Sequence, residues 1–230
     1  MTTFVLIHGG GDTGWSFHLV AAQLEARGHE VIAPDLPAGD DALRFEDYVD
    51  AVVALVDSGR EVVVLGHSFG AFTAPPVAAR LSAAALVLLA GMVPRPGESA
   101  EQWWTATGYA DAVAAQAARD DGLTGNDDPY VTYYHDVPRA LAEEALRRES
   151  DHPSTAAYAE PWPLAAWPDV PTHFLLCTED RFFPPDLFRR IVPERLGIVP
   201  DEVPGGHCVA LSRPAELADR LEGYAVPTRS

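Results

Sequence analysis

One serine of this chain lies between two glycines, at the point where a buried strand is expected to give way to a helix. The apolar run EVVVL at 61–65 leads into GHSFG at 66–70. In so tight a turn the residues two before and two after the serine approach each other, and Gly66 and Gly70 avoid the collision. The turn holds the Ser68 hydroxyl clear of the sheet, with the unpaired N–H groups of the next helix facing any developing anion. This strand-to-helix context, more than the GxSxG match by itself, predicts a nucleophilic serine.

A nucleophilic serine needs a base to accept its proton and an acid to orient that base. An apolar run that ends in TEDRFFP places Asp180 just past the carboxyl end of a strand, and the last apolar run leads through PGG to His207. The chain order Ser68, Asp180, His207 is that of α/β-hydrolase-type triads and differs from the chymotrypsin and subtilisin orders. Glu179 and Asp201 are rival acids. Asp201 lies within the expected last strand, which would hold it away from the histidine ring. Pro184 follows Asp180 in an Asp-x-x-x-Pro pattern, which favours Asp180 over Glu179.

A glycine-rich loop follows the first apolar run. The run FVLI at 4–7 leads into HGGGDTGW at 8–15. Glycines let a backbone approach a substrate closely, so the N–H of Gly10 is expected to join the N–H of Phe69 in holding an oxyanion. A phosphate-binding loop is the alternative, but the spacing is not GxGxxG and His8 occupies the position where that turn would begin.

Short apolar runs alternate with amphipathic stretches along most of the chain. Such runs are typical of parallel strands buried on both faces. The alternation indicates an α/β fold with a mostly parallel sheet of about six strands, helices on both faces and ligands at the carboxyl ends of the strands. We expect strands near 4–7, 30–33, 61–65, 84–90, 172–177 and 198–203, and helices near 15–27, 45–57, 70–81, 184–195 and 214–224.

This alternation breaks off between about 94 and 168, a segment rich in Trp and Tyr. We interpret the segment as two or three helices inserted between the fourth and fifth strands. The chain would then be a single domain, 1–230, whose core comprises 1–93 and 169–230. No stretch of the chain resembles a linker.

Aromatic side chains above a nucleophile would form the wall of a pocket and exclude water, although most of them are expected to pack the interior of their own segment. Trp103 and Trp104 cannot both face the same way on a helix, so one of the two is expected to face the pocket or solvent. The candidate residues of the substrate pocket are Trp103, Trp104, His8 and His67. The two histidines are expected there as packing or hydrogen-bonding neighbours rather than as second bases.

Together these motifs resemble the α/β-hydrolase superfamily over almost the whole chain. The likeness is greatest to the small branch of plant methylesterases and hydroxynitrile lyases, with its bacterial esterase-like relatives. It implies a strand order 2-1-3-4-5-6, a cap formed by the inserted segment, no cofactor, a triad of Ser68, His207 and Asp180, and an oxyanion hole at Gly10 and Phe69. The lyases of this branch carry a lysine directly after the catalytic histidine, where this chain has Cys208. That departure weakens the lyase interpretation.

All 16 basic residues are arginine, and 34 acidic residues bring the formal net charge to −18. An anionic surface repels nucleic acid and acidic membranes, so neither is expected as a partner. No apolar run approaches a membrane span, and the chain enters a strand directly after MTT, so a cytoplasmic protein is expected. Cys177 and Cys208 are expected as free thiols, and without clustered histidines they predict no metal site.

The sequence therefore predicts hydrolysis of a small ester, thioester or lactone, with an apolar or aromatic substrate and a monomeric or homodimeric protein. Two other classes stay open. One is a carbon–carbon lyase of the hydroxynitrile type, which would need a substitute for the missing lysine. The other is a non-enzymatic ligand receptor that retains the fold. Many hydrolases with different substrates share this fold and triad, so the pattern does not identify the substrate.

Overall fold

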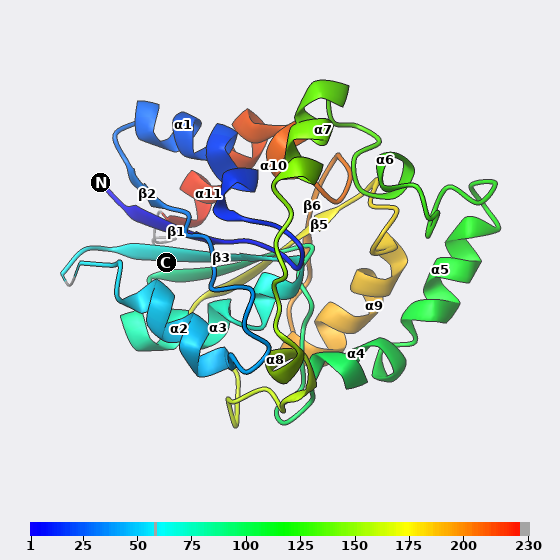
Figure 1. Cartoon of the computed structure of the whole chain (residues 1–230). Helices are drawn as coiled ribbons and strands as arrows, with labels where there is room; N and C mark the ends of the chain where they lie inside the picture. The colour runs from blue at the N-terminus through cyan, green and yellow to red at the C-terminus, as the bar shows by residue number, and fades with distance from the viewer. Residues whose placement is uncertain (58, 226–230) are drawn as a thin grey trace.

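Six parallel strands form one sheet at the centre of the molecule (Figure 1). The computed structural model describes residues 1–57 and 59–225. The strand order is β2-β1-β3-β4-β5-β6 and every pairing is parallel, which confirms the predicted fold class and strand order. The strands are β1 (Thr3–Ile7), β2 (Glu30–Ile32), β3 (Val62–His67), β4 (Ala85–Leu89), β5 (Thr172–Cys177) and β6 (Asp201–Val203).

Three inner strands, β1, β3 and β4, are buried along their whole length. Parallel strands that helices cover on both faces read as continuous apolar runs, which is why the pattern located them. The expected start of the last strand at 198 is wrong. Gly197 ends the preceding helix in the left-handed conformation, Val199 is 85% exposed, and Pro200 has no N–H to donate to a ladder. The strand therefore begins only at Asp201.

Helices cover both faces of the sheet (Figure 1). On one face α1 (His18–Ala26) packs against α11 (Pro214–Ala225), and on the other α2 (Phe45–Val53) packs against α3 (Ala74–Leu81). The helix expected at 70–81 is interrupted, because Pro75 and Pro76 lack the N–H groups that would continue α3 backwards. The short 3₁₀ helix η2 (Ser68–Ala71) precedes α3 instead. The other core helices are η1 (Gly14–Phe17), α9 (Pro185–Leu196) and α10 (Val209–Ser212).

The segment between β4 and β5, of which the structure describes every residue, contains five helices where two or three were expected (Figure 1). We call residues 94–168 the insert. Three of its buried or half-buried indoles donate to backbone carbonyls: Trp103 to Val93 (3.1 Å), Trp162 to Phe72 (2.9 Å) and Trp167 to Pro94 (3.2 Å). The first two bonds attach the insert to the core, and the third joins the two ends of the insert. Its helices are α4 (Ala100–Ala106), α5 (Tyr109–Ala117), α6 (Pro129–Thr132), α7 (Arg139–Arg147) and α8 (Thr155–Ala159).

The structure also bears on the expected relation to membranes. Within residues 1–57 and 59–225 no helix is both long enough and apolar enough to span a bilayer.

Candidate active site

Ser68 occupies a strained turn between β3 and η2. Its φ is +51°, in the left-handed region that residues with a side chain rarely adopt. A methyl group on Gly66 would lie 2.6 Å from Cβ of Ala74, and one on Gly70 would lie 2.5 Å from the carbonyl oxygen of His8. Glycine is therefore required at both positions, as predicted, and a methyl group on Gly66 would also lie 2.8 Å from the carbonyl oxygen of Gly70. The new helix lies behind position 66, and the end of β1 lies beside position 70.

Asp180 and His207 are joined by a hydrogen bond of 2.8 Å between Nδ1 of the ring and Oδ2 of the carboxylate. The other carboxylate oxygen accepts the backbone N–H groups of Phe182 and Phe183, each at 2.8 Å. Asp180 is 1% exposed and His207 is 4% exposed. Because the carboxylate acts as the acceptor of all three bonds, Nδ1 of His207 carries the ring proton and Nε2 is the basic atom.

The structure brings Ser68 and His207 to the wall of one cavity. In the described part of the chain no hydrogen bond joins the two side chains, which is common before a substrate binds. The rival acids lie elsewhere. Glu179 is exposed, and the exposed carboxylate of Asp201 accepts a hydrogen bond of 2.6 Å from the hydroxyl of Tyr224.

His67 lies behind His207 rather than in the cavity lining. The two ring centroids are 4.7 Å apart, and Nε2–H of His67 donates to the backbone carbonyl of His207 at 3.0 Å. Burial, with the nearby charge of His207, lowers the pKa of His67 well below its usual value. The ring therefore stays neutral, with its single proton on Nε2. His67 is therefore a hydrogen-bonding neighbour of His207, as expected from the sequence, rather than a second base.

His8 and Trp103 also lie outside the cavity lining. His8 is fully buried, and its Nε2 accepts the N–H of Leu36 at 3.0 Å. Trp103 is fully buried against the core, whereas Trp104 lines the cavity. One tryptophan of the pair is therefore buried and the other faces the cavity, as expected. Placing His8, His67 and Trp103 in the pocket is wrong, because packing and a backbone hydrogen bond hold each of the three elsewhere.

The loop that carries Gly10 is bound to the insert. The N–H of Gly11 donates to the carbonyl of His152 at 2.7 Å, and the N–H of Ser150 donates to the carbonyl of Gly11 at 2.9 Å. Gly10 and Phe69 both line the cavity, and a methyl group on Gly10 would lie 3.7 Å from Cβ of Phe69. Phe69 belongs to the first turn of η2, where N–H groups have no partner within the helix. Such a pair of backbone donors could hold an oxyanion.

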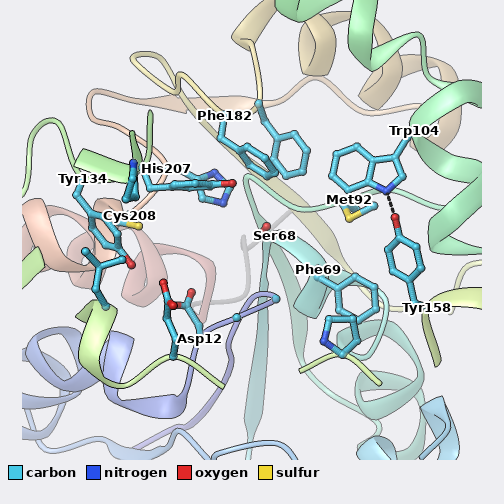
Figure 2. A pocket seen from close by; sticks show the side chains of 18 residues that line it. Asp12, Ser68, Phe69, Met92, Trp104, Tyr134, Tyr158, Phe182, His207 and Cys208 are labelled. Atoms are coloured by element: carbon cyan, nitrogen blue, oxygen red, sulfur yellow. Dashed lines mark hydrogen bonds between the residues drawn. The ribbon is translucent and has the colours of Figure 1, made fainter. Parts of the chain in front are cut away.

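A cavity of about 410 Å³ opens beside Ser68 (Figure 2). This volume suits a small molecule. Much of the wall is aromatic or apolar, and the indole N–H of Trp104 is occupied by the hydroxyl of Tyr158 at 2.6 Å. The main apolar side chains are those of Phe69, Met92, Trp104, Phe182 and Phe183.

Another part of the lining is polar and comprises Asp12, Tyr134, Glu149 and Cys208. Burial raises the pKa of Asp12 to about 6, an effect that the charge of His207 opposes and that of Glu149 increases. Burial raises the pKa of Tyr134 and, strongly, that of Cys208, so both groups are neutral at pH 7. Sequence reasoning missed Asp12 and Glu149. The only available signal was the position of Asp12 directly after the glycines of the predicted oxyanion loop.

Asp12→Asn is expected to stabilise the protein at neutral pH. The pKa of this carboxyl rises from 3.8 to about 6 on folding, so the folded state binds more protons between these pH values. The free energy of unfolding of the parent should therefore fall as pH rises from about 4 to 6, by up to about 3 kcal/mol relative to the variant. Urea denaturation across pH 4–8 measures the difference. The exposed Asp169→Asn is the control, and parallel curves for the parent and Asp12→Asn would contradict the prediction.

Comparison with known proteins agrees with this architecture. Residues 4–220 match a family described as the alpha/beta hydrolase family. An esterase from Oryza sativa subsp. japonica is 26% identical over 95% of this chain and 93% of its own length. A carbendazim hydrolyzing esterase from Nocardioides sp. is 25% identical over 96% of this chain and 98% of its own. The structure of a pyrethroid hydrolase from Sphingobium faniae superposes with a TM-score of 0.75 at 22% identity, covering 100% of this chain and 99% of that one.

The family match begins in β1 and ends in α11, so it includes every strand of the sheet. The likeness to the solved structure extends over the same sheet and over the insert. The chain belongs to the alpha/beta hydrolase family.

Proposed function

We propose that the protein is a serine esterase that cleaves a small carboxylic ester through an acyl-enzyme on Ser68. The observation that carries the proposal is the hydrogen bond between Asp180 and His207 at the wall of the cavity that contains the serine hydroxyl. The names of the rice and Nocardioides relatives support ester hydrolysis as the reaction class.

In the proposed reaction Nε2 of His207 accepts the proton of Ser68 while the serine oxygen attacks the ester carbonyl carbon. The N–H groups of Gly10 and Phe69 stabilise the oxyanion. The carbon–oxygen bond to the alcohol then breaks, and His207 returns the proton to the leaving alcohol. Water repeats the sequence on the acyl-enzyme and releases the acid. Asp180 keeps the proton on Nδ1 throughout and stabilises the imidazolium.

We also assign the insert the role of a cap. Trp104 and Tyr158 come from it and close one side of the cavity, and the contact of Ser150 with Gly11 ties it to the loop of Gly10. Its aromatic walls would exclude water from the acyl-enzyme except for the attacking molecule. The hydrogen bond between the serine and histidine side chains would then form as substrate fills the cavity.

Hydroxynitrile cleavage has no comparable support. The released cyanide needs a cation nearby, the chain has no lysine, and within the described residues no arginine lines the cavity. The insert arginines are exposed and paired instead: Arg95 with Glu194, Arg119 with Asp186, Arg139 with Glu143, and Arg147 and Arg148 with Glu144.

Labelling with a fluorophosphonate tests the proposal. We expect one covalent adduct, located on Ser68 by mass spectrometry, and loss of p-nitrophenyl butyrate hydrolysis in proportion to the labelled fraction. An adduct elsewhere, or hydrolysis that persists in fully labelled protein, would contradict the assignment of the nucleophile. Labelling without turnover of any ester would favour the ligand receptor.

A further inference from the structure

The carboxylate of Asp12 lies in the cavity lining, and among the described residues no arginine pairs with it. Its Oδ2 is 3.8 Å from Nδ1 of His67, the unprotonated nitrogen of a neutral ring. Within the described residues no arginine lies within 4.0 Å of Asp12 or Glu149, and Arg148, which precedes Glu149, pairs with Glu144. A half-buried carboxylate without a partner opposes folding. Asp12 is such a group, and Glu149 is an exposed carboxylate beside the same cavity. The unpaired charge of Asp12 is therefore better explained by a ligand that supplies the missing positive charge.

Tyr134 is an independent sign of a ligand at this place. It is 9% exposed and lines the cavity, and its hydroxyl has no hydrogen-bond partner among the described residues. Figure 2 shows this hydroxyl turned toward Asp12. The hydroxyl oxygen is not among the buried unpaired atoms of the described residues, so it is open to the cavity and available to a bound molecule. The ring face offers a second attraction to a cation.

We propose that Asp12, Glu149 and Tyr134 bind a protonated amine, and that the ester substrate carries this group on its alcohol or acyl part. The inference rests on the ester hydrolysis proposed above. An ammonium N–H would donate to Asp12, the exposed carboxylate of Glu149 would attract the same charge, and carbon substituents on the nitrogen would contact the tyrosine ring. The formal net charge of −18 would favour the approach of such a cation.

The amine and the ester carbonyl must be separated by a short spacer. A methyl group on Gly9 would lie 3.0 Å from Cβ of Ser68 and 3.5 Å from Oδ2 of Asp12, so the nucleophile and the carboxylate border the same small volume. Two carbons between the nitrogen and the ester group suit this arrangement. The apolar remainder of the substrate would lie against Phe182 and Trp104.

Matched ester pairs test the inference at pH 7. One pair is 2-(dimethylamino)ethyl acetate and its carbon isostere 3-methylbutyl acetate. The other, with the amine on the acyl part, is ethyl 3-(dimethylamino)propanoate and ethyl 4-methylpentanoate. For each ester, kcat/KM is divided by the rate constant of its uncatalysed hydrolysis. In at least one pair we expect this ratio to be about tenfold or more higher for the amine ester than for its isostere. Asp12→Asn should reduce that preference about tenfold, Glu149→Gln by a smaller factor because its carboxylate is exposed, and Glu101→Gln, an exposed carboxylate of the insert outside the cavity lining, should not change it.

Several results would overturn the inference while leaving ester hydrolysis intact. One is equal use of both members in both pairs. Another is an amine preference that survives in Asp12→Asn and Glu149→Gln. A third is a loss in Asp12→Asn that is equal for the amine and the isostere, which would mean that Asp12 acts on His207 rather than on substrate.

If the protein hydrolyses none of these esters, the inference is tested by how strongly each alcohol slows labelling of Ser68. We expect 2-(dimethylamino)ethanol to slow fluorophosphonate labelling of Ser68 more than 3-methylbutan-1-ol does, and Asp12→Asn to abolish the difference. Equal slowing by the two alcohols would overturn the inference. Absence of both labelling and hydrolysis would overturn the proposed esterase, and the amine site would be rejected with it.

Discussion

Ser68→Ala is expected to lower kcat/KM for ester hydrolysis by about 10⁴-fold or more, because the residual rate comes only from binding and the oxyanion donors. The fold should be retained. The serine hydroxyl has no hydrogen-bond partner among the described protein groups, so its removal leaves no buried donor or acceptor unpaired. Alanine has the same Cβ atom as serine, so the backbone strain at a φ of +51° should be similar in the variant. Initial rates and the urea midpoint measure the two expectations separately.

Ser82→Ala is the matched control for this experiment. Ser82 has a φ of +49° at the end of α3 and is exposed, so the change repeats the chemistry and the backbone strain far from the cavity. It should leave the rate and the stability near those of the parent. Substantial hydrolysis by Ser68→Ala, in protein that a fluorophosphonate no longer labels, would show that another group attacks the ester.

Much of the fold could be predicted because its determinants are local. β3 and β4 appear as unbroken apolar runs since helices bury both of their faces, and a tight turn after β3 requires glycines at fixed spacing. Short edge strands lack that signal. β6 has two exposed residues out of three, which is why its start was misplaced. The number of helices in the insert was underestimated because segments of four or five residues are too short for a periodic pattern.

The supporting part of the site could not be predicted, because it depends on contacts between distant segments. His67 and the carbonyl that it binds are separated by 140 positions in the chain. Asp12 is a turn residue in the sequence, and only the fold brings it to the same cavity as Glu149 of the insert. Charge content did not help, since acidic residues are frequent throughout a chain with a formal net charge of −18.

Asp180→Asn is also expected to lower kcat/KM by about 10⁴-fold, as the corresponding change does in serine proteases. Oδ1 accepts the N–H groups of Phe182 and Phe183, and in asparagine only the amide oxygen can take that role. The amide NH₂ then faces Nδ1 of His207, where the carboxylate now accepts a hydrogen bond at 2.8 Å. Two donors cannot face each other, so the ring proton moves to Nε2. The lone pair that would accept the proton of Ser68 is lost.

Asp201→Asn is the matched control, because it makes the same chemical change in the rival acid. Among the described residues only Tyr224 donates a hydrogen bond to the exposed carboxylate of Asp201, and an asparagine oxygen can accept that bond instead. We expect kcat/KM within about threefold of the parent. The pair of variants, compared in initial rates at pH 7, therefore decides which strand supplies the acid. A greater loss in Asp201→Asn than in Asp180→Asn would assign the acid to β6, and the bond between Asp180 and His207 would then be a structural contact.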